Sequence, residues 1–159
     1  MAARIRYPAV AQPGDLVELR LLIELPALRK LTDRGLSDQE LALVRKLADA
    51  TMRSARSGDV LGYLRADMVF HLYLLELTGD PALSEIARLL LAPDRVCAPR
   101  AGDLMLREAR EHCQLTDMLA DDAVSAADDL LRLHLSRLSA DPSAPARHDR
   151  PESISRAGA

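Results

Sequence analysis

The sequence predicts an all-α protein, an antiparallel bundle of about six helices in one domain. Leu and Ala dominate the composition, aromatic residues make up 3% of the 159 residues and Trp is absent. This composition suits helices packed through aliphatic side chains better than a β-sandwich or barrel. Apolar residues also recur three and four positions apart over several segments, the period of an amphipathic helix.

Six segments are predicted to be helical. They cover residues 15–33, 37–57, 60–78, 81–92, 103–120 and 122–139. Pro26 should kink or interrupt the first helix, because proline donates no backbone hydrogen bond. Ser37 and Glu40 have the spacing of a capping box, which opens the second helix. Asp59 is the predicted cap of the third helix, and Pro81 suits the first turn of the fourth.

The last two helices follow the one substantial internal loop. This loop, residues 93–102, contains two prolines and a glycine and precedes the fifth helix. Asp121 and Asp122 separate the fifth helix from the sixth, and we expect this pair to form a turn and a helix cap rather than a catalytic dyad.

The predicted domain covers residues 15–140, between a linker remnant at 1–14 and a disordered tail at 141–159. The first residues lack the apolar run of a signal peptide, and no segment is long and apolar enough to span a bilayer. Cys97 and Cys113 lack the spacing of a disulfide framework or zinc ribbon. We therefore expect a cytoplasmic protein with reduced thiols and no membrane partner.

Three histidines carry the most informative pattern. His71, His112 and His134 each fall on the apolar side of a different predicted helix, and Asp67 lies one turn before His71 on the same face. One such histidine alone is usually a core residue with a satisfied hydrogen bond. Burying three imidazoles and a carboxylate together is costly, and one divalent cation satisfies all four. Imidazole and carboxylate ligands favour zinc, nickel or manganese.

The chain also resembles a known family in three stretches. They read DLVELRLLIELPALRKLTDRGLSDQELALVRKL, DMVFHLYLLELTGDPAL and EHCQLTDMLADDAVSAADDLLRLHLSRL. In that order they resemble successive parts of the FCD ligand-binding domain of FadR-type GntR transcription regulators. The most specific features are the D-x-x-x-H motif of Asp67 and His71, the E-H pair at His112 and the H-L pair at His134.

The resemblance implies an antiparallel helical bundle with a metal held by Asp67, His71, His112 and His134. It also implies a small organic acid effector that completes the coordination shell of the metal. Arg20 could bind an effector carboxylate through two parallel hydrogen bonds, although an exposed or ion-paired arginine is the commoner interpretation. Cys113 is expected in the core, since its side chain points about 100° away from that of His112 on a helix.

The family's regulators carry a winged helix-turn-helix before this domain, and the residues before Asp15 resemble the end of an interdomain linker. The formal net charge of −3, from 21 basic and 24 acidic residues, offers no global attraction to nucleic acid. We therefore expect that this chain alone does not bind duplex DNA. We expect a homodimer, because the resemblance implies one and because Leu21 and Leu25 widen the apolar face of the first helix.

These observations favour a metal-containing, ligand-sensing domain of a transcription regulator, which is not an enzyme. A metal-dependent hydrolase is the first alternative, because three histidines and a carboxylate could activate water. The absence of a further acid on an apolar stripe near the ligands weighs against it, since hydrolysis needs a general base. The second alternative is a helical dimerisation module with a structural metal.

Overall fold

The computed structural model describes residues 13–91 and 102–137, and it confirms the all-α prediction. The described helices are α1 (Pro13–Arg34), α2 (Asp38–Ser57), α3 (Val60–Glu76), α4 (Pro81–Leu90), α5 (Gly102–Ala120) and α6 (Val124–Ser136). No strand occurs within these ranges. The tail predicted at 141–159 lies outside the described residues, as do most of the predicted linker and of the 93–102 loop, so these three predictions stay untested.

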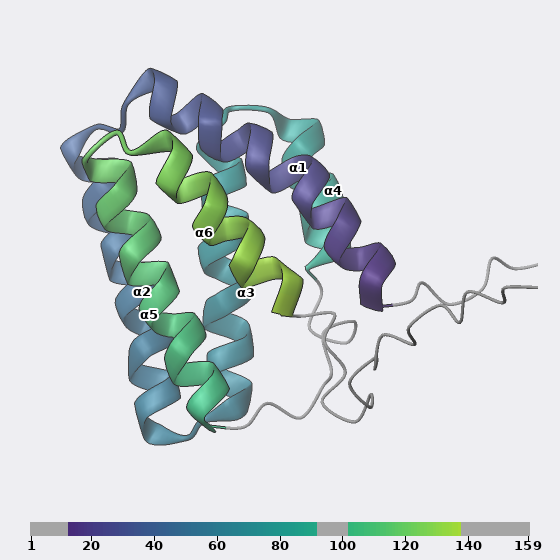
Figure 1. Ribbon diagram of the computed structural model, residues 1–159, viewed down its shortest axis with the longest axis vertical. Coiled ribbons are helices and arrows are strands. Elements are labelled where there is room, and N and C mark those ends of the chain that lie inside the picture. The colour runs from purple at the N-terminus through teal and green to yellow at the C-terminus, as the bar shows by residue number, and fades with distance from the viewer. Residues whose placement is uncertain (1–12, 92–101, 138–159) are drawn as a thin grey trace, which may run out of the picture.

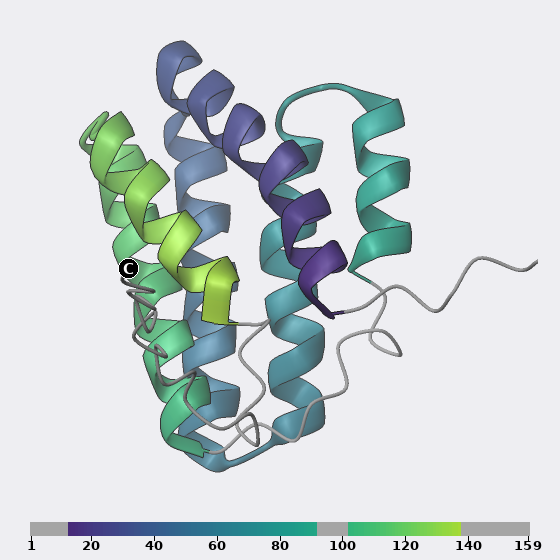
Figure 2. The same cartoon turned by 45° about the vertical axis from the view of Figure 1, so that its right-hand side comes forward.

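The helices form a bundle with α1 lying across one side of it. The helix α2 packs along both α3 and α5, and α6 packs on α5. On the other side, α1 contacts α3, α4 and α6 and crosses the upright helices obliquely (Figure 1). The turned view in Figure 2 shows α4 beside α1, at the edge of the bundle. The helix α3 therefore packs against α1, α2 and α4, and α5 packs against α2 and α6.

Several helix ends follow the sequence signals. The Ser37 side chain accepts a hydrogen bond from the Glu40 backbone, and the Glu40 carboxylate accepts one from the Ser37 backbone at 2.8 Å, which confirms the capping box. Gly58 ends α2 in the left-handed conformation, with φ of 69°, which glycine adopts without steric cost. The Asp59 side chain caps α3, and Pro81 occupies the first turn of α4 as predicted.

Two local details differ from the sequence predictions: the interruption at Pro26 and the cap at Asp122. Pro26 does not interrupt α1, which continues to Arg34, because Leu25 and Leu28 on either side of it are buried in the core and hold the helix in place. Asp122 is not a helix cap. It adopts φ of 53° in the turn, a conformation that Asp tolerates, and Ala123 precedes α6 without a side-chain cap.

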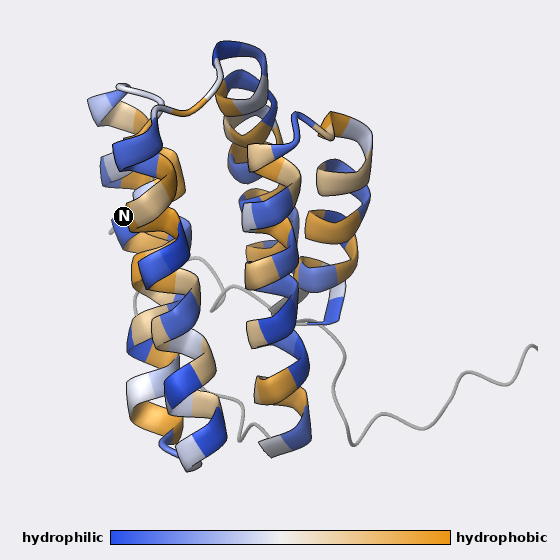
Figure 3. Cartoon of the chain, turned by 90° about the vertical axis from the view of Figure 1, so that its left-hand side faces the viewer, coloured by the Kyte–Doolittle hydropathy of each residue, from blue (hydrophilic) through white to orange (hydrophobic). Residues whose placement is uncertain are grey.

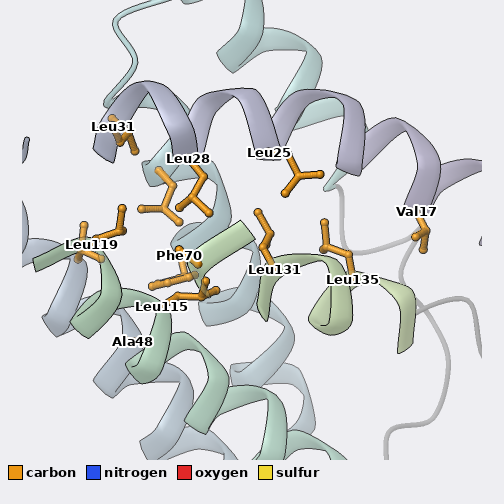
Figure 4. Close-up of a cluster of buried hydrophobic side chains, with 13 residues drawn as sticks. Val17, Leu25, Leu28, Leu31, Ala48, Phe70, Leu115, Leu119, Leu131 and Leu135 are labelled. Atoms are coloured by element: carbon orange, nitrogen blue, oxygen red, sulfur yellow. The ribbon is translucent and has the colours of Figure 1, made fainter. Parts of the chain in front are cut away.

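The main core is aliphatic except for Phe70 and joins five helices. It contains Val17, Leu25, Leu28, Leu31, Val44, Ala48, Phe70, Leu74, Leu115, Leu119, Ala127, Leu131 and Leu135. Figure 4 shows many of these side chains filling the space beneath α1. Orange apolar and blue polar residues alternate around the long helices (Figure 3), as amphipathic helices of a bundle require. None of the described helices combines the length and apolar character needed to cross a bilayer.

Candidate metal centre

The structure brings Asp67, His71, His112 and His134 together in the middle of the bundle. Asp67 and His71 lie one turn apart on α3, while His112 comes from α5 and His134 from α6. All four side chains are buried, and the two histidines on α3 and α5 have no exposed surface. The four predicted ligands thus share one water-poor site.

The three imidazoles point the same ring nitrogen at one another. The Nε2 atom of His71 lies 3.2 Å from that of His134. The Nε2 atom of His112 lies 3.3 Å from each of the other two. The Oδ1 atom of Asp67 is 3.4 Å from His112 Nε2, and all four candidate ligand atoms lie within 4.8 Å of one another.

Two glutamates determine which ring nitrogen of His71 and of His134 carries the proton. His71 Nδ1 lies 2.7 Å from Glu24 Oε2, and His134 Nδ1 lies 2.9 Å from Glu111 Oε2. An ionised carboxylate only accepts hydrogen bonds, so both Nδ1 atoms must be the donors. Both glutamates are held ionised: burial alone would raise the pKa of each, but Arg20 and His71 lower that of Glu24 to about 2, and His134 and Arg137 lower that of Glu111.

The Thr51 hydroxyl determines which ring nitrogen of the third imidazole, His112, carries the proton. His112 Nδ1 lies 3.1 Å from Thr51 Oγ1, and this hydroxyl donates its own proton to the Ala48 carbonyl at 2.7 Å. Thr51 is therefore left to accept, and His112 Nδ1 donates. In its neutral form, each of the three imidazoles therefore takes the tautomer that leaves the Nε2 lone pair directed at the centre.

This donor set fits a divalent metal ion. Each Nδ1 proton is donated to an acceptor outside the centre. No imidazole proton therefore lies between the three Nε2 lone pairs and the Asp67 carboxylate oxygen that converge there. Burial, and then the neighbouring His134, lower the pKa of His112 well below its usual value, so protonation is a poor way to relieve the repulsion. Ligands on a metal with bonds of about 2.0–2.2 Å lie about 3.0–3.5 Å apart, which matches the spacing of the three Nε2 atoms.

Phe70 forms an apolar wall of the centre. Its ring centroid lies 4.4 Å from that of His112, with the ring planes 31° apart, and 5.4 Å from that of His71 in an edge arrangement. Phe70 has no exposed surface. Such a wall excludes water and strengthens electrostatic interactions between the ligands and a bound cation.

Arg20 lies beside this centre rather than at the surface. It is 3% exposed, and its Nε atom pairs with Glu24 Oε1 at 2.5 Å. The ion-paired interpretation of Arg20 is therefore confirmed and the exposed one is wrong. Burial lowers the pKa of Arg20, but the charges of Glu24, Asp67 and Glu108 outweigh burial and raise it. The Nη2 atom is buried and makes no hydrogen bond to the residues that the structure describes.

The expectation that no further acid lies near the ligands was wrong. Glu24, Glu108 and Glu111 are all buried around the centre. Glu108 lies four residues before His112 on one helix face, so the helical period could have revealed it. Glu24 and Glu111 gave no such signal, because their positions depend on how α1 and α6 pack against their neighbours.

The structure also places the remaining candidate residues. Cys113 is partly buried against the main core, as expected, and does not belong to the group of candidate ligands. Asp121 and Asp122 are exposed and lie in a turn far along the chain from the ligands of α3. His148 and Cys97 lie outside the described residues.

Comparison with known proteins identifies the family of this domain. Residues 15–137 match the family model of the FCD domain. The chain is 27% identical over 139 residues to the HTH-type transcriptional repressor NanR of Enterobacter sp. (strain 638), covering 82% of this chain and 52% of that protein. The NanR repressor of Salmonella newport (strain SL254) is 26% identical over the same length and coverage. The chain thus spans about half the length of these relatives.

Solved structures with the same fold are also regulators or their domains. One is Lar, which controls expression of the Listeria monocytogenes agr system, with a TM-score of 0.71 at 15% identity over 82% of this chain and 64% of that one. Another is the metal-free FCD domain of TM0439, with a TM-score of 0.66 at 17% identity over 82% of this chain and 93% of that one. At these identities the likeness concerns the fold alone.

The role of Thr51 as an acceptor can be tested with an isosteric change. Thr51→Val leaves the buried His112 Nδ1–H without its partner and should lower the free energy of unfolding by about 1–3 kcal/mol. Thr116→Val is the matched control, since the Thr116 hydroxyl only donates to the His112 backbone carbonyl and its loss should cost less than about 1 kcal/mol. Denaturant titration at equal metal loading measures both, and equal losses would contradict the assignment.

Proposed function

The chain belongs to the FCD domain family, and we propose that it is the ligand-sensing domain of a GntR-type transcription regulator that binds a divalent metal and a small organic acid. The convergence of three Nε2 lone pairs beside Asp67 and Arg20 is the observation that carries this proposal. The relatives that bear curated names are repressors of transcription rather than enzymes.

The four residues Asp67, His71, His112 and His134 would hold the metal, with zinc, nickel or manganese as the candidates. When bound, the metal supplies positive charge and open coordination positions for an oxygen ligand. Glu24, Thr51 and Glu111 orient the imidazoles for this task. Such outer partners fix the ring orientation and raise the basicity of a ligand nitrogen.

Metal binding is tested by removing one ligand. His112→Ala should lower the metal content of protein purified without chelator, and its affinity in a metal titration should fall by more than about tenfold. His148→Ala is the control, because this histidine belongs to none of the predicted ligand positions. Elemental analysis measures both proteins. If the His112 variant retains as much metal as a loaded wild type, the proposed centre is wrong.

An acid would be recognised from the side of α1. Arg20 lies on this helix beside the centre and is buried, and its Nη2 atom has no hydrogen-bond partner among the described residues. Guanidinium groups bind carboxylates through short charge-assisted hydrogen bonds. Arg20 and Glu24 also tie α1 to the ligands, so a bound acid would bear on the position of α1 within the bundle.

If Arg20 binds the carboxylate of the effector, a conservative substitution of Arg20 should weaken that binding. Arg20→Lys keeps the charge but loses the planar group, and carboxylate affinity should fall about tenfold or more while the metal is retained. Arg29→Lys is the control on the same helix, since Arg29 pairs with Asp128 instead. Melting temperatures of metal-loaded protein with a carboxylate panel report binding through mass action. The absence of any shift in the wild type would exclude an acid effector.

Leu21 and Leu25 do not support the predicted homodimer. Leu25 is buried, and Leu21 packs against the same core, so neither widens an outer face. Instead α1 exposes Leu22, at 70%, and the adjacent α4 exposes Leu89, at 62%. Large apolar side chains on two helices that pack together are a feature of protein interfaces, and we assign this face to a second copy of the chain.

The dimer is tested with a charge on this face. Leu22→Asp should convert a wild-type dimer into a monomer by light scattering at micromolar concentration, because burying the carboxylate at an interface is costly. Leu133→Asp, at an exposed position of α6, is the control and should remain dimeric. A monomeric wild type would contradict the assignment.

We further propose that the chain does not bind duplex DNA on its own, since it is net negative and its described helices bury their apolar faces in the bundle. A retarded complex with random duplex DNA at physiological salt would contradict this. The hydrolase alternative finds no support in the buried acids, because Glu24 and Glu111 orient His71 and His134, and Glu108 accepts a hydrogen bond from Tyr63.

A further inference from the structure

The first helix has a weak point in its backbone at Pro26. Proline has no backbone N–H, so the carbonyl of Leu22 lacks the hydrogen bond that another residue at position 26 would donate to it. The helix α1 is continuous through this point, but sharp bends in helices often occur at a proline. Pro26 therefore separates two segments of α1, residues 15–24 and residues 27–34.

The second segment is anchored to the bundle independently of the metal ligands. It buries the side chains of Ala27, Leu28, Leu31 and Thr32. Arg29 Nε lies 2.6 Å from Asp128 Oδ2 on α6, and Lys30 Nζ donates to the Thr78 carbonyl at 2.9 Å. None of these contacts includes a proposed metal ligand. They therefore hold residues 27–34 in place whether or not a metal is bound.

The first segment is attached largely through the metal centre. Within residues 15–24, one buried side chain is apolar and two are charged: Val17, Arg20 and Glu24. Glu24 Oε2 accepts a hydrogen bond from His71 Nδ1 at 2.7 Å, and Glu24 Oε1 pairs with Arg20 Nε at 2.5 Å. Leu21 and Ile23 add partly buried contacts. Because buried charges are stable only while they are paired, the contact with His71 is central to this attachment.

His71 connects the first segment to a bound ion. A His71 ring that is coordinated through Nε2 cannot turn, and the charge of the ion makes its Nδ1–H a stronger donor to Glu24. Without an ion, the Nε2 atoms of the three histidines face one another at 3.2 or 3.3 Å with no attraction between their lone pairs. The hydrogen bond from His71 to Glu24 is therefore stronger and better fixed in the metal-bound protein.

We propose that Pro26 is a hinge controlled by the metal centre. Bound metal holds residues 15–24 against the bundle, and without metal these residues open locally while residues 27–34 stay in place. This inference rests on the proposed function, in which His71 is a metal ligand. Leu22 lies on the first segment and belongs to the face that we assign to the second copy of the chain, so metal occupancy acts on that face through α1.

Hydrogen exchange of backbone amides tests the hinge. The full chain is compared by NMR with saturating zinc and after removal of zinc by a chelator. Zinc should slow the exchange of residues 17–24 by a factor at least about tenfold larger than that of residues 30–34. The amides of residues 27–29 are left out, because in a helix they bond across Pro26. A general gain in stability would slow both groups by the same factor.

Two variants act on different parts of the hinge. Glu24→Gln keeps the shape but removes the charge that faces His71, and at full zinc loading it should reduce the excess protection of residues 17–24 at least about threefold. Pro26→Ala restores the missing N–H and should protect residues 17–24 without zinc, so the excess also falls at least about threefold. This variant keeps the test decisive if Glu24→Gln does not fold. Glu18→Gln, at an exposed position of the same segment, is the control and should retain the full excess.

Elemental analysis of the same samples distinguishes failure of the hinge from failure of the metal centre. If zinc is bound and slows exchange equally in both segments, the hinge is wrong and the metal centre stands. An excess that persists unchanged in the Glu24 and Pro26 variants would also overturn the hinge. If the chain binds none of zinc, nickel and manganese, both the metal centre and the hinge are wrong.

Discussion

The rest of the structure depends on one constraint, the convergence of three Nε2 lone pairs. The distances between these nitrogens match those between two ligand atoms on the same metal ion. Their three Nδ1 protons point outward to Glu24, Thr51 and Glu111, so the imidazoles cannot relieve one another by sharing a proton in this tautomer. A cation at the centre turns this mutual repulsion into attraction. The buried group therefore has the donors and the geometry to hold a cation.

The same contacts connect the helices. Glu24 links α1 to α3, Thr51 links α2 to α5, and Glu111 links α5 to α6. Each outer partner that orients a ligand thus also fixes a helix relative to its neighbour. The buried carboxylates greatly outnumber the buried cations, because Arg20 is the one lysine or arginine that is buried among the described residues. A metal, together with the partly exposed Arg137 that pairs with Glu111, would restore the balance of charge.

The periodicity of the sequence was sufficient for the helices and for the grouping of the four ligands. Asp67 and His71 share a face of one helix, and His112 and His134 interrupt the apolar stripes of two others, so local patterns carried the information. The hydrogen-bond partners of the imidazoles depend on how the helices cross. The periodicity of one helix carries no information about how it crosses its neighbours. Leu25 illustrates the limit: its place beside the inward stripe suggested an outer contact, but the oblique path of α1 turns it into the core.

The tautomers of the three histidines test this account most directly. Nitrogen-15 NMR of histidine-labelled protein, in a long-range proton correlation with and without zinc, distinguishes a protonated Nδ1 from a protonated Nε2 in each ring. The account predicts that His71, His112 and His134 all carry the proton on Nδ1 and that zinc shifts all three Nε2 resonances together. If any of these rings carries its proton on Nε2 in the zinc-loaded protein, or if zinc leaves one of them unshifted, the centre is not the one described.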